Sequence, residues 1–230
     1  MRTPSLIALL SLLFVSSAHA AISTAEASRL REASAVLAEF HNASDKGIPE
    51  DLWNRAQCVV VVPSLKKAAF ILGGEYGKGV MSCRTGKGWS APVFMELEKG
   101  SLGFQVGGEQ IDLVLVVLNR RGVEKMLQDK VTLGADASVA AGPLGRTAAA
   151  ATDAQMAAEI LSYSRSQGLF AGIDVSGGAL RPDKGANEDV YGPSHSPREI
   201  AEGARVKVPA EAKQFLATLS RESRPTTGKK

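Results

Sequence analysis

The glycine-rich stretch Gly73–Gly79 is the part of this sequence best suited to bind a negatively charged group. It holds four glycines in seven positions, with Lys78 between two of them. Glycines let backbone amides approach a phosphate, and lysine supplies the opposite charge. The spacing differs from GxxxxGK[ST], so a nucleotide P-loop is not indicated. The alternative, which we favour, is a bulged or sharply curved pair of strands.

Residues for catalysis or metal binding are sparse. Beyond Ala20 the histidines are His41 and His195, and neither has a partner at metal-ligand spacing. The sequence has no GxSxG, HExxH, EF-hand loop or GxGxxG after a strand. Its carboxylates are scattered, so no acid–base pair can be named. We therefore predict a protein that is not an enzyme and uses no metal or cofactor.

The first residues have the features of a secretory signal peptide. Arg2 gives a positive start, Leu6–Val15 is apolar, and Ala18-His19-Ala20 fits the rule of small residues before a cleavage site. The apolar stretch is short for a membrane span, and a retained N-terminal anchor is the alternative. We expect cleavage after Ala20 and export to the periplasm or the medium.

Two cysteines, Cys58 and Cys83, remain after that cleavage. An exported protein meets an oxidising compartment, where an even number of cysteines favours a disulfide. Both lie in strand-like runs, which suits neighbouring strands. We predict the disulfide, with two buried free thiols as the alternative.

The overall charge excludes one class of partner. The formal net charge is +3, and loss of Arg2 leaves 26 basic against 24 acidic residues, a net charge of +2. This balance argues against binding of nucleic acid through bulk charge. Aromatic residues are few and glycines number 23, which favours a glycine-rich β structure over a helical bundle.

Runs of apolar residues predict the strands. Cys58–Val62 is continuously apolar and Ile111–Leu118 is strongly apolar, as buried strands are, and a polar connection should follow the first run at Ser64–Lys67. Val131–Arg146 alternates apolar with small or polar residues before a Gly-Pro-Leu-Gly turn, so we predict a β-hairpin there. Turns recur at strand-length intervals from Cys58 to Val175, without a linker.

Helices are expected at both ends of the chain. Ser23 and Glu26 form a capping box for a helix reaching about Phe40. This helix could lie on a membrane surface or dock on its own domain, and its mixed charges favour docking. Pro209–Leu219 is the last amphipathic helix, and Arg221–Lys230 should be a flexible basic tail.

Together these elements predict an α+β fold. Its core is a large, curved, mainly antiparallel sheet, barrel-like and closed or nearly closed, flanked by N-terminal and C-terminal helices. The division of the chain is a signal peptide at 1–20, a single domain at 21–220 and the tail at 221–230.

Five runs, in order along the chain, resemble the SYLF domain family. This lipid-binding domain is also described as an actin-binding domain in yeast proteins. The similarity extends from about Glu26 to Gly192. It is carried by GGEYGKGV at Gly73–Val80, GWSAPVF at Gly88–Phe94, VTLGADASVAAGPLGR at Val131–Arg146, ILSYSRSQGLFAG at Ile160–Gly172 and DVYG at Asp189–Gly192.

The resemblance implies binding rather than catalysis, and the signal peptide suggests the bacterial, exported branch. Eukaryotic members associate with phosphoinositide-rich membranes through an N-terminal amphipathic segment and basic residues, and some yeast members bundle actin. The matching N-terminal segment here is Ser23–Phe40.

From the resemblance and the basic residues we predict a module of the cell envelope that binds anionic phospholipid head groups. A structural or protein-interaction domain without a lipid ligand is the alternative. Expected partners are a phospholipid or membrane surface, or an envelope protein. Nucleic acid is not expected, and actin is an unlikely partner for an exported protein. The predicted contacts are Lys66, Lys67, Gly74, Gly77, Lys78, Gly79, Arg84, Lys87 and Arg146.

Overall fold

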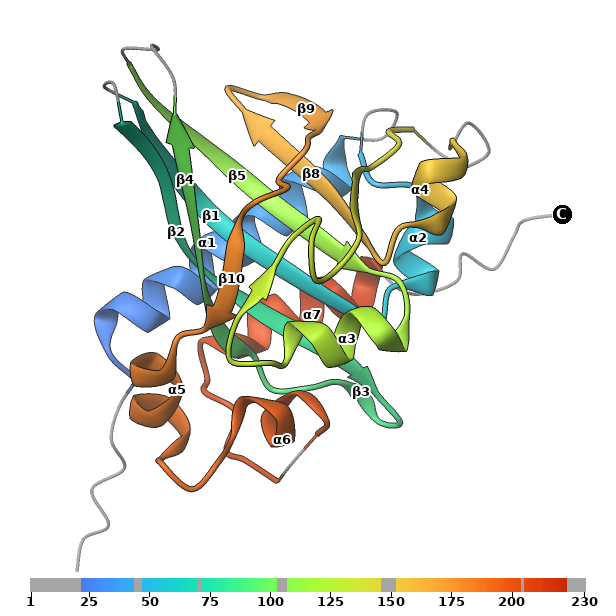
Figure 1. Cartoon of the computed structure of the whole chain (residues 1–230). Coiled ribbons are helices and arrows are strands. Elements are labelled where there is room, and N and C mark those ends of the chain that lie inside the picture. The colour runs from blue at the N-terminus through green and yellow to red at the C-terminus, as the bar shows by residue number, and fades with distance from the viewer. Residues whose placement is uncertain are drawn as a thin grey trace, which may run out of the picture.

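The computed structural model describes residues 22–43, 47–69, 72–102, 107–145, 152–203 and 205–222. Within them, ten strands form one sheet (Figure 1), with the order β6-β10-β4-β2-β1-β5-β8-β7, β3 beside β2 and β9 beside β8. The strands are β1 Cys58–Ala69, β2 Leu72–Thr85, β3 Gly88–Trp89, β4 Val93–Leu102, β5 Gly107–Val117, β6 Val131–Thr132, β7 Val139–Ala141, β8 Ile160–Ser166, β9 Leu169–Gly172 and β10 Ala179–Pro182.

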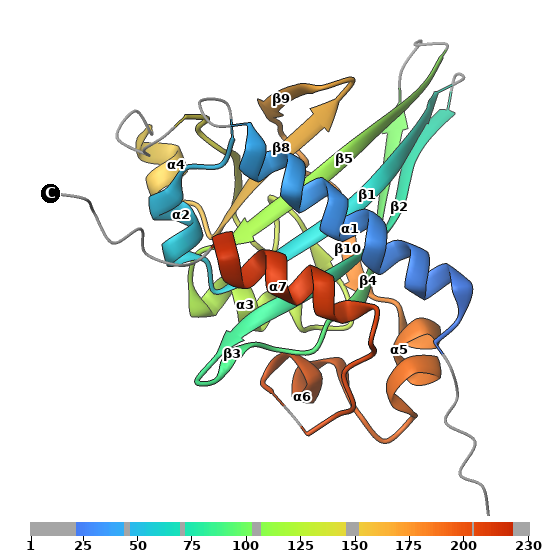
Figure 2. The same ribbon diagram turned by 180° about the vertical axis from the view of Figure 1, so that it is seen from behind.

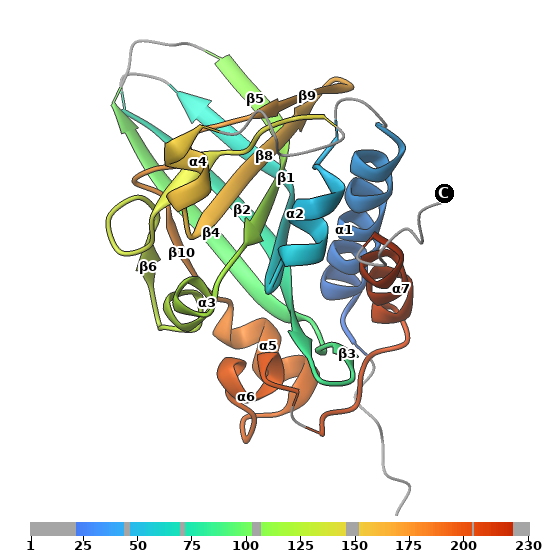
Figure 3. The same cartoon turned by 90° about the vertical axis from the view of Figure 1, so that its right-hand side faces the viewer.

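The sheet is mainly antiparallel and curls into a half-barrel (Figure 3), as the sequence predicted. Of the described strand pairs, β7 with β8 is the parallel one. The sheet order begins with β6 and ends with β7, and only residues 133–138 connect these two strands along the chain. That short connection holds the two ends of the sheet near each other.

The single alternating strand predicted before the turn of the Val131–Arg146 hairpin is wrong. β6 pairs with β10, whereas β7 pairs with β8, so the two halves of the alternating run serve opposite ends of the sheet. The chain turns early because the Asp136 carboxylate accepts a hydrogen bond from the Thr132 amide at 2.7 Å, next to Gly134 at φ 85°. Residues 146–151, where the return strand was expected, lie outside the described residues.

Seven described helices complete the fold. They are α1 Thr24–Asn42, α2 Glu50–Arg55, α3 Arg120–Met126, α4 Asp153–Ala157, α5 Lys184–Tyr191, α6 Pro197–Ala201 and α7 Ala212–Glu222. α1 and α7 lie side by side across one face of the sheet (Figure 2), and α3 lies on the other side (Figure 3). None of the described helices is long and apolar enough to cross a membrane.

The N-terminal helix is docked on its own domain, as the sequence favoured. The side chain of Ser23 caps α1 by accepting from the Glu26 amide, and Leu30, Ala33 and Leu37 are fully buried. The apolar side of α1 therefore belongs to the core and does not face solvent.

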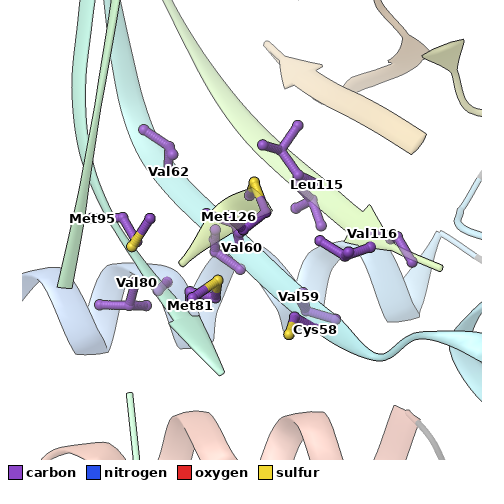
Figure 4. Packing of buried hydrophobic residues seen from close by; sticks show 14 of the residues in the cluster. Cys58, Val59, Val60, Val62, Val80, Met81, Met95, Leu115, Val116 and Met126 are labelled. Atoms are coloured by element: carbon purple, nitrogen blue, oxygen red, sulfur yellow. The ribbon is translucent and has the colours of Figure 1, made fainter. Parts of the chain in front are cut away.

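The core explains why β1 and β5 are so strongly apolar. Val60 and Leu115 are fully buried and lie among the side chains of Met81, Met95 and Met126 (Figure 4). These central strands are covered on both faces, by helices on one side and by the curl of the sheet on the other, so both sides of each strand must be apolar.

β1 does not end at the predicted polar connection. It continues to Ala69 through a bulge, where its register with β5 shifts between Val62 and Leu65. Ser64 adopts φ 56° at the bulge, and its amide donates to Asp112 Oδ1 at 2.9 Å. A bulge therefore carries the strand past the polar residues that suggested a loop.

The glycine-rich stretch is part of strand β2, which confirms the bulged-strand reading. A Cβ on Gly77 would lie 2.5 Å from Val62 Cγ1, and one on Gly79 would lie 2.3 Å from the Val61 carbonyl oxygen. Glycine at these two positions makes room for the bulged segment of β1. The predicted Cys58–Cys83 disulfide joins the beginning of β1 to the last residues of β2, and the two cysteines are direct partners in the β1–β2 register.

Candidate anion-binding cleft

A cleft of about 510 Å³ opens where the first turns of α1 cross β1 and β2. We call it the α1–β2 cleft. Its residues come from α1, β1, β2 and β5, and three of them are basic: Arg29, Lys66 and Lys78. The others are Ala25, Ser28, Glu32, Pro63, Ser64, Tyr76, Gly77 and Gln110.

The strand register places the polar side chains together. Lys66 is the direct partner of Tyr76 on β2 and of Gln110 on β5. Partners across neighbouring strands point to the same face of a sheet, so these three side chains share the face that α1 covers. The bulge just before Lys66 sets this register, which links the Ser64 turn to the position of the lysine.

Asp183, the N-cap of α5, binds two of the cleft's three basic residues. Its Oδ2 accepts from Arg29 Nη1 at 3.1 Å and from Lys78 Nζ at 2.9 Å. Its Oδ1 accepts from the Ala186 amide at 3.2 Å and so caps the helix. One carboxylate thus connects α1, β2 and α5.

The two cations differ in how far they reach solvent. The Arg29 side chain is only 6% exposed, and its guanidinium carbon lies 5.2 Å from the centre of the Phe94 ring. Lys78 is 43% exposed. Arg29 is therefore part of the packed structure, whereas Lys78 can reach a ligand in the cleft.

The ion pair changes the titration of both partners. The hydrogen bond to Asp183 is the main reason that the pKa of Lys78 is raised. Burial alone would raise the pKa of Asp183, but the hydrogen bonds from Lys78 and the Ala186 amide, with the charge of Arg29, lower it overall. Both groups are charged at neutral pH.

Lys66 is exposed, and no carboxylate of the described residues forms a salt bridge with it. Its ammonium group is therefore accessible to an incoming anion. Lys66 and Lys78 are thus the two cations through which the cleft could bind a negatively charged group.

The structure brings together Lys66, Gly77 and Lys78 of the residues predicted from the sequence. Gly74 lies farther along β2, opposite Ala68 and Gly100. Gly79 is accounted for by its packing against β1. A ligand role for either of these glycines stays a prediction.

Arg84 lies at the other end of β2 and is bound within the protein. Its Nε donates to the Ala56 carbonyl at 2.8 Å and its Nη2 to the Trp53 carbonyl at 3.0 Å, while the guanidinium stacks on Trp89. Burial lowers the pKa of Arg84. Lys87 is exposed in the turn between β2 and β3.

Two predicted contacts cannot be placed in the cleft from the structure. Lys67 belongs to β1, but its side chain lies outside the described residues, as does all of Arg146. Their roles stay predictions. Among the described residues, no group of three or more His, Cys, Asp and Glu side chains could hold a metal ion.

Sequence reasoning missed Arg29 and Asp183. Arg29 stands beside Leu30 and four residues before Ala33, within the stripe of α1 that faces the core. A charged residue in such a stripe signals a buried partner. Asp183 follows Pro182 and precedes a helix, which is the pattern of an N-cap, but its partners lie more than a hundred residues away in the chain.

Residues 98–222 match the family described as "Ysc84: Las17-binding protein actin regulator". The chain is 36% identical over 201 residues to "Protein YSC84" of Saccharomyces cerevisiae, covering 84% of this chain and 42% of that protein. It is 34% identical over 200 residues to "SH3 domain-containing YSC84-like protein 1" of Xenopus laevis, covering 84% and 59%.

A third relative is "LAS seventeen-binding protein 3" of Saccharomyces cerevisiae, 33% identical over 213 residues, with 87% of this chain and 46% of that protein covered. The chain thus spans about half the length of the curated relatives it matches.

The match corrects one expectation drawn from the sequence. Actin was judged an unlikely partner because of predicted export, yet the matching family is described as an actin regulator. That judgement was wrong because a predicted signal peptide indicates the compartment of a protein. It does not indicate which partners the surface of the domain can bind. The match also agrees with a binding or regulatory domain rather than an enzyme family. The chain belongs to the Ysc84 family, which confirms the resemblance to the SYLF domain family.

Proposed function

We propose that this chain is a non-enzymatic module that binds anionic phospholipid head groups in the α1–β2 cleft. The observation that carries the proposal is the presence of two solvent-exposed lysines, Lys66 and Lys78, in one cleft. Hydrogen bonds between an ammonium group and a phosphate oxygen are among the stronger polar contacts in proteins. Two such contacts from adjacent strands would hold a phosphate at the mouth of the cleft.

The polar surroundings of these lysines suit a head group. Ser28, Ser64 and Gln110 offer hydroxyl and amide groups, and Tyr76 is 43% exposed beside them. Glu32 also lines the cleft, and Asp183 pairs with Arg29 and Lys78 beside it, so three positive charges meet two negative ones. A net positive cleft attracts a phosphate more strongly at low ionic strength, because salt screens exposed charges.

The buried apolar face of α1 favours peripheral binding at the cleft over insertion of this helix into a bilayer. Leu30 and Leu37 are fully buried, so membrane insertion would require α1 to leave the core. That step would expose apolar surface of the sheet at a cost of roughly 25 cal/mol for each Å².

We further propose that the module acts outside the cytoplasm. The support is the signal peptide predicted from the first twenty residues together with the Cys58–Cys83 disulfide, since disulfides persist in oxidising compartments. Protein purified after export, with its N-terminus determined by mass spectrometry, should begin at Ala21.

Vesicle co-sedimentation tests the lipid proposal. The exported protein should sediment with phosphatidylcholine vesicles containing phosphatidylglycerol and much less with pure phosphatidylcholine. Lys66→Glu should weaken sedimentation with the anionic vesicles. Lys130→Glu, the same charge change at an exposed lysine outside the cleft, is the matched control. Equal sedimentation with both vesicle types, or with neither, would contradict the proposal.

Protein interaction is the second candidate function, and the family description favours it. Relatives carry the names "Protein YSC84" and "LAS seventeen-binding protein 3", and the family is described as an actin regulator. Co-sedimentation with filamentous actin, run beside the vesicle assay, separates the two functions. Sedimentation with actin and not with anionic vesicles would replace the lipid proposal.

A further inference from the structure

We propose that Asp183 is an internal competitor for the anion site: its carboxylate holds Lys78, and a bound phosphate must take Lys78 away from it. This inference rests on the proposed function, because it concerns the same cleft. It assigns to Asp183 a regulatory effect on affinity in addition to its role as the cap of α5.

Hydrogen bonds hold both the backbone and the side chain of Asp183 in position. Its own amide donates to the Phe94 carbonyl at 2.9 Å, and its carbonyl accepts from Asn187 Nδ2 at 2.8 Å. Its Oδ1 caps α5 through the Ala186 amide. With backbone and side chain both bound, the carboxylate stays beside the cleft whether or not a ligand is present.

Arg29 is fixed as well. It is buried, contacts the Phe94 ring, and pairs with Glu26 at 3.6 Å in addition to Asp183. Lys78, whose side chain is 43% exposed, is the more accessible of the two cations. It can turn toward a ligand while Arg29 continues to neutralise Asp183.

The competition lowers affinity by the free energy of the Lys78–Asp183 pair. Pairs with one exposed partner are worth up to about 1 kcal/mol, which corresponds to about a fivefold change in a binding constant. Removing the charge of Asp183 should therefore tighten phosphate binding by about three- to fivefold. The gain in affinity requires Lys78, because the Asp183 carboxylate lowers affinity by pairing with that lysine.

A double-mutant cycle tests this requirement. Asp183→Asn removes the charge and keeps a residue that can cap α5, and Asp183→Ser does the same with another good cap. Each is combined with Lys78→Met. Two probes are used: phosphatidylcholine vesicles containing phosphatidylglycerol, and inorganic phosphate followed by calorimetry, which separates a lipid surface from a free phosphate group.

The matched control is Glu159→Gln. Glu159 is also a buried carboxylate that pairs with two cations, Lys125 at 2.8 Å and Arg121 at 3.1 Å, but it lies outside the cleft. This variant changes the net charge by the same amount as Asp183→Asn. It should leave the binding of both probes unchanged.

The inference is supported if Asp183→Asn or Asp183→Ser tightens binding three- to fivefold and has no effect in the Lys78→Met protein. It is overturned, with the proposed function intact, if wild-type binding is lost in Lys66→Glu but neither Asp183 variant alters it. An equal gain with and without Lys78 would also overturn it, since long-range charge would then explain the effect. If the wild type binds neither probe, the proposed function fails and the inference with it.

Discussion

The ring of Tyr163 fills the space where a side chain at position 142 would lie. A Cβ built on Gly142 would come within 2.0 Å of Tyr163 Cζ, and Tyr163 is fully buried. The residue that follows β7 must therefore be glycine if the ring is to keep its place. This contact connects two of the runs that carry the family resemblance, Val131–Arg146 and Ile160–Gly172.

Gly142→Ala should destabilise the protein by about 1–3 kcal/mol, because an added methyl group in a packed core forces the ring or the backbone to move. Urea denaturation measures the free energy of unfolding. Gly86→Ala is the control, since nothing lies within 4 Å of a Cβ at that position. Equal stability of the two variants would show that the core around Tyr163 can relax at no cost.

The Cys58–Cys83 disulfide should stabilise the folded protein by about 3 kcal/mol, because the loop that it closes has less entropy in the unfolded chain. Cys58 and Cys83 are 25 residues apart in the sequence. The variant Cys58→Ala/Cys83→Ala should unfold at lower urea concentration than the oxidised wild type, and reductant should shift the wild type alone. An unfolding midpoint that reductant does not move would mean that the bond contributes no stability.

Elements of the fold could be predicted from the sequence where a short run of residues is enough to determine the local structure. The apolar runs of β1 and β5 and the Ser23 cap of α1 needed no knowledge of the rest of the chain. The prediction of one continuous strand at Val131–Ala141 failed because a period of two indicates an extended segment but does not identify the strand with which it pairs. β6 and β7 find their partners at opposite ends of the sheet.

The cleft could be predicted only in part for a similar reason. Lys66 and Lys78 stood out because they lie near glycines and near each other in sequence. Arg29 and Asp183 meet across 154 positions of the chain, and no local window contains both. The bulge at Ser64 was hidden as well, because the polar residues that form it are also typical of a loop.

Acid should destabilise the protein partly through Glu159. Burial raises the pKa of this carboxyl, but hydrogen bonds from Lys125 and the Ser138 amide outweigh it, so the pKa is lowered in the folded state. A lowered folded-state pKa means that stability is present above the unfolded-state pKa and is lost as the pH falls through the folded-state value. The free energy of unfolding, measured from about pH 6 down to about pH 3, should fall less steeply for Glu159→Gln than for the wild type.

Glu124→Gln is the control for the acid measurement. Glu124 is 53% exposed and pairs with Arg120 on the surface of α3. This variant should follow the wild-type profile. A Glu159→Gln profile as steep as that of the wild type would assign the acid sensitivity to other carboxyl groups.

Arg84 and Lys87 were both predicted as head-group contacts, and substitutions there should separate structure from binding. Arg84→Ala leaves the carbonyl groups of Ala56 and Trp53 without their guanidinium donor and removes the stacking on Trp89. A loss of about 1–3 kcal/mol in the free energy of unfolding follows, because partly buried acceptors lose their partner. Binding to anionic vesicles should persist below the unfolding transition.

Lys87→Glu, at an exposed turn, should change neither the free energy of unfolding nor vesicle binding beyond the small effect of its charge. A drop in vesicle binding for the folded Arg84→Ala or Lys87→Glu protein as large as that for Lys66→Glu would instead place the lipid surface along the whole length of β2, rather than at the cleft under α1.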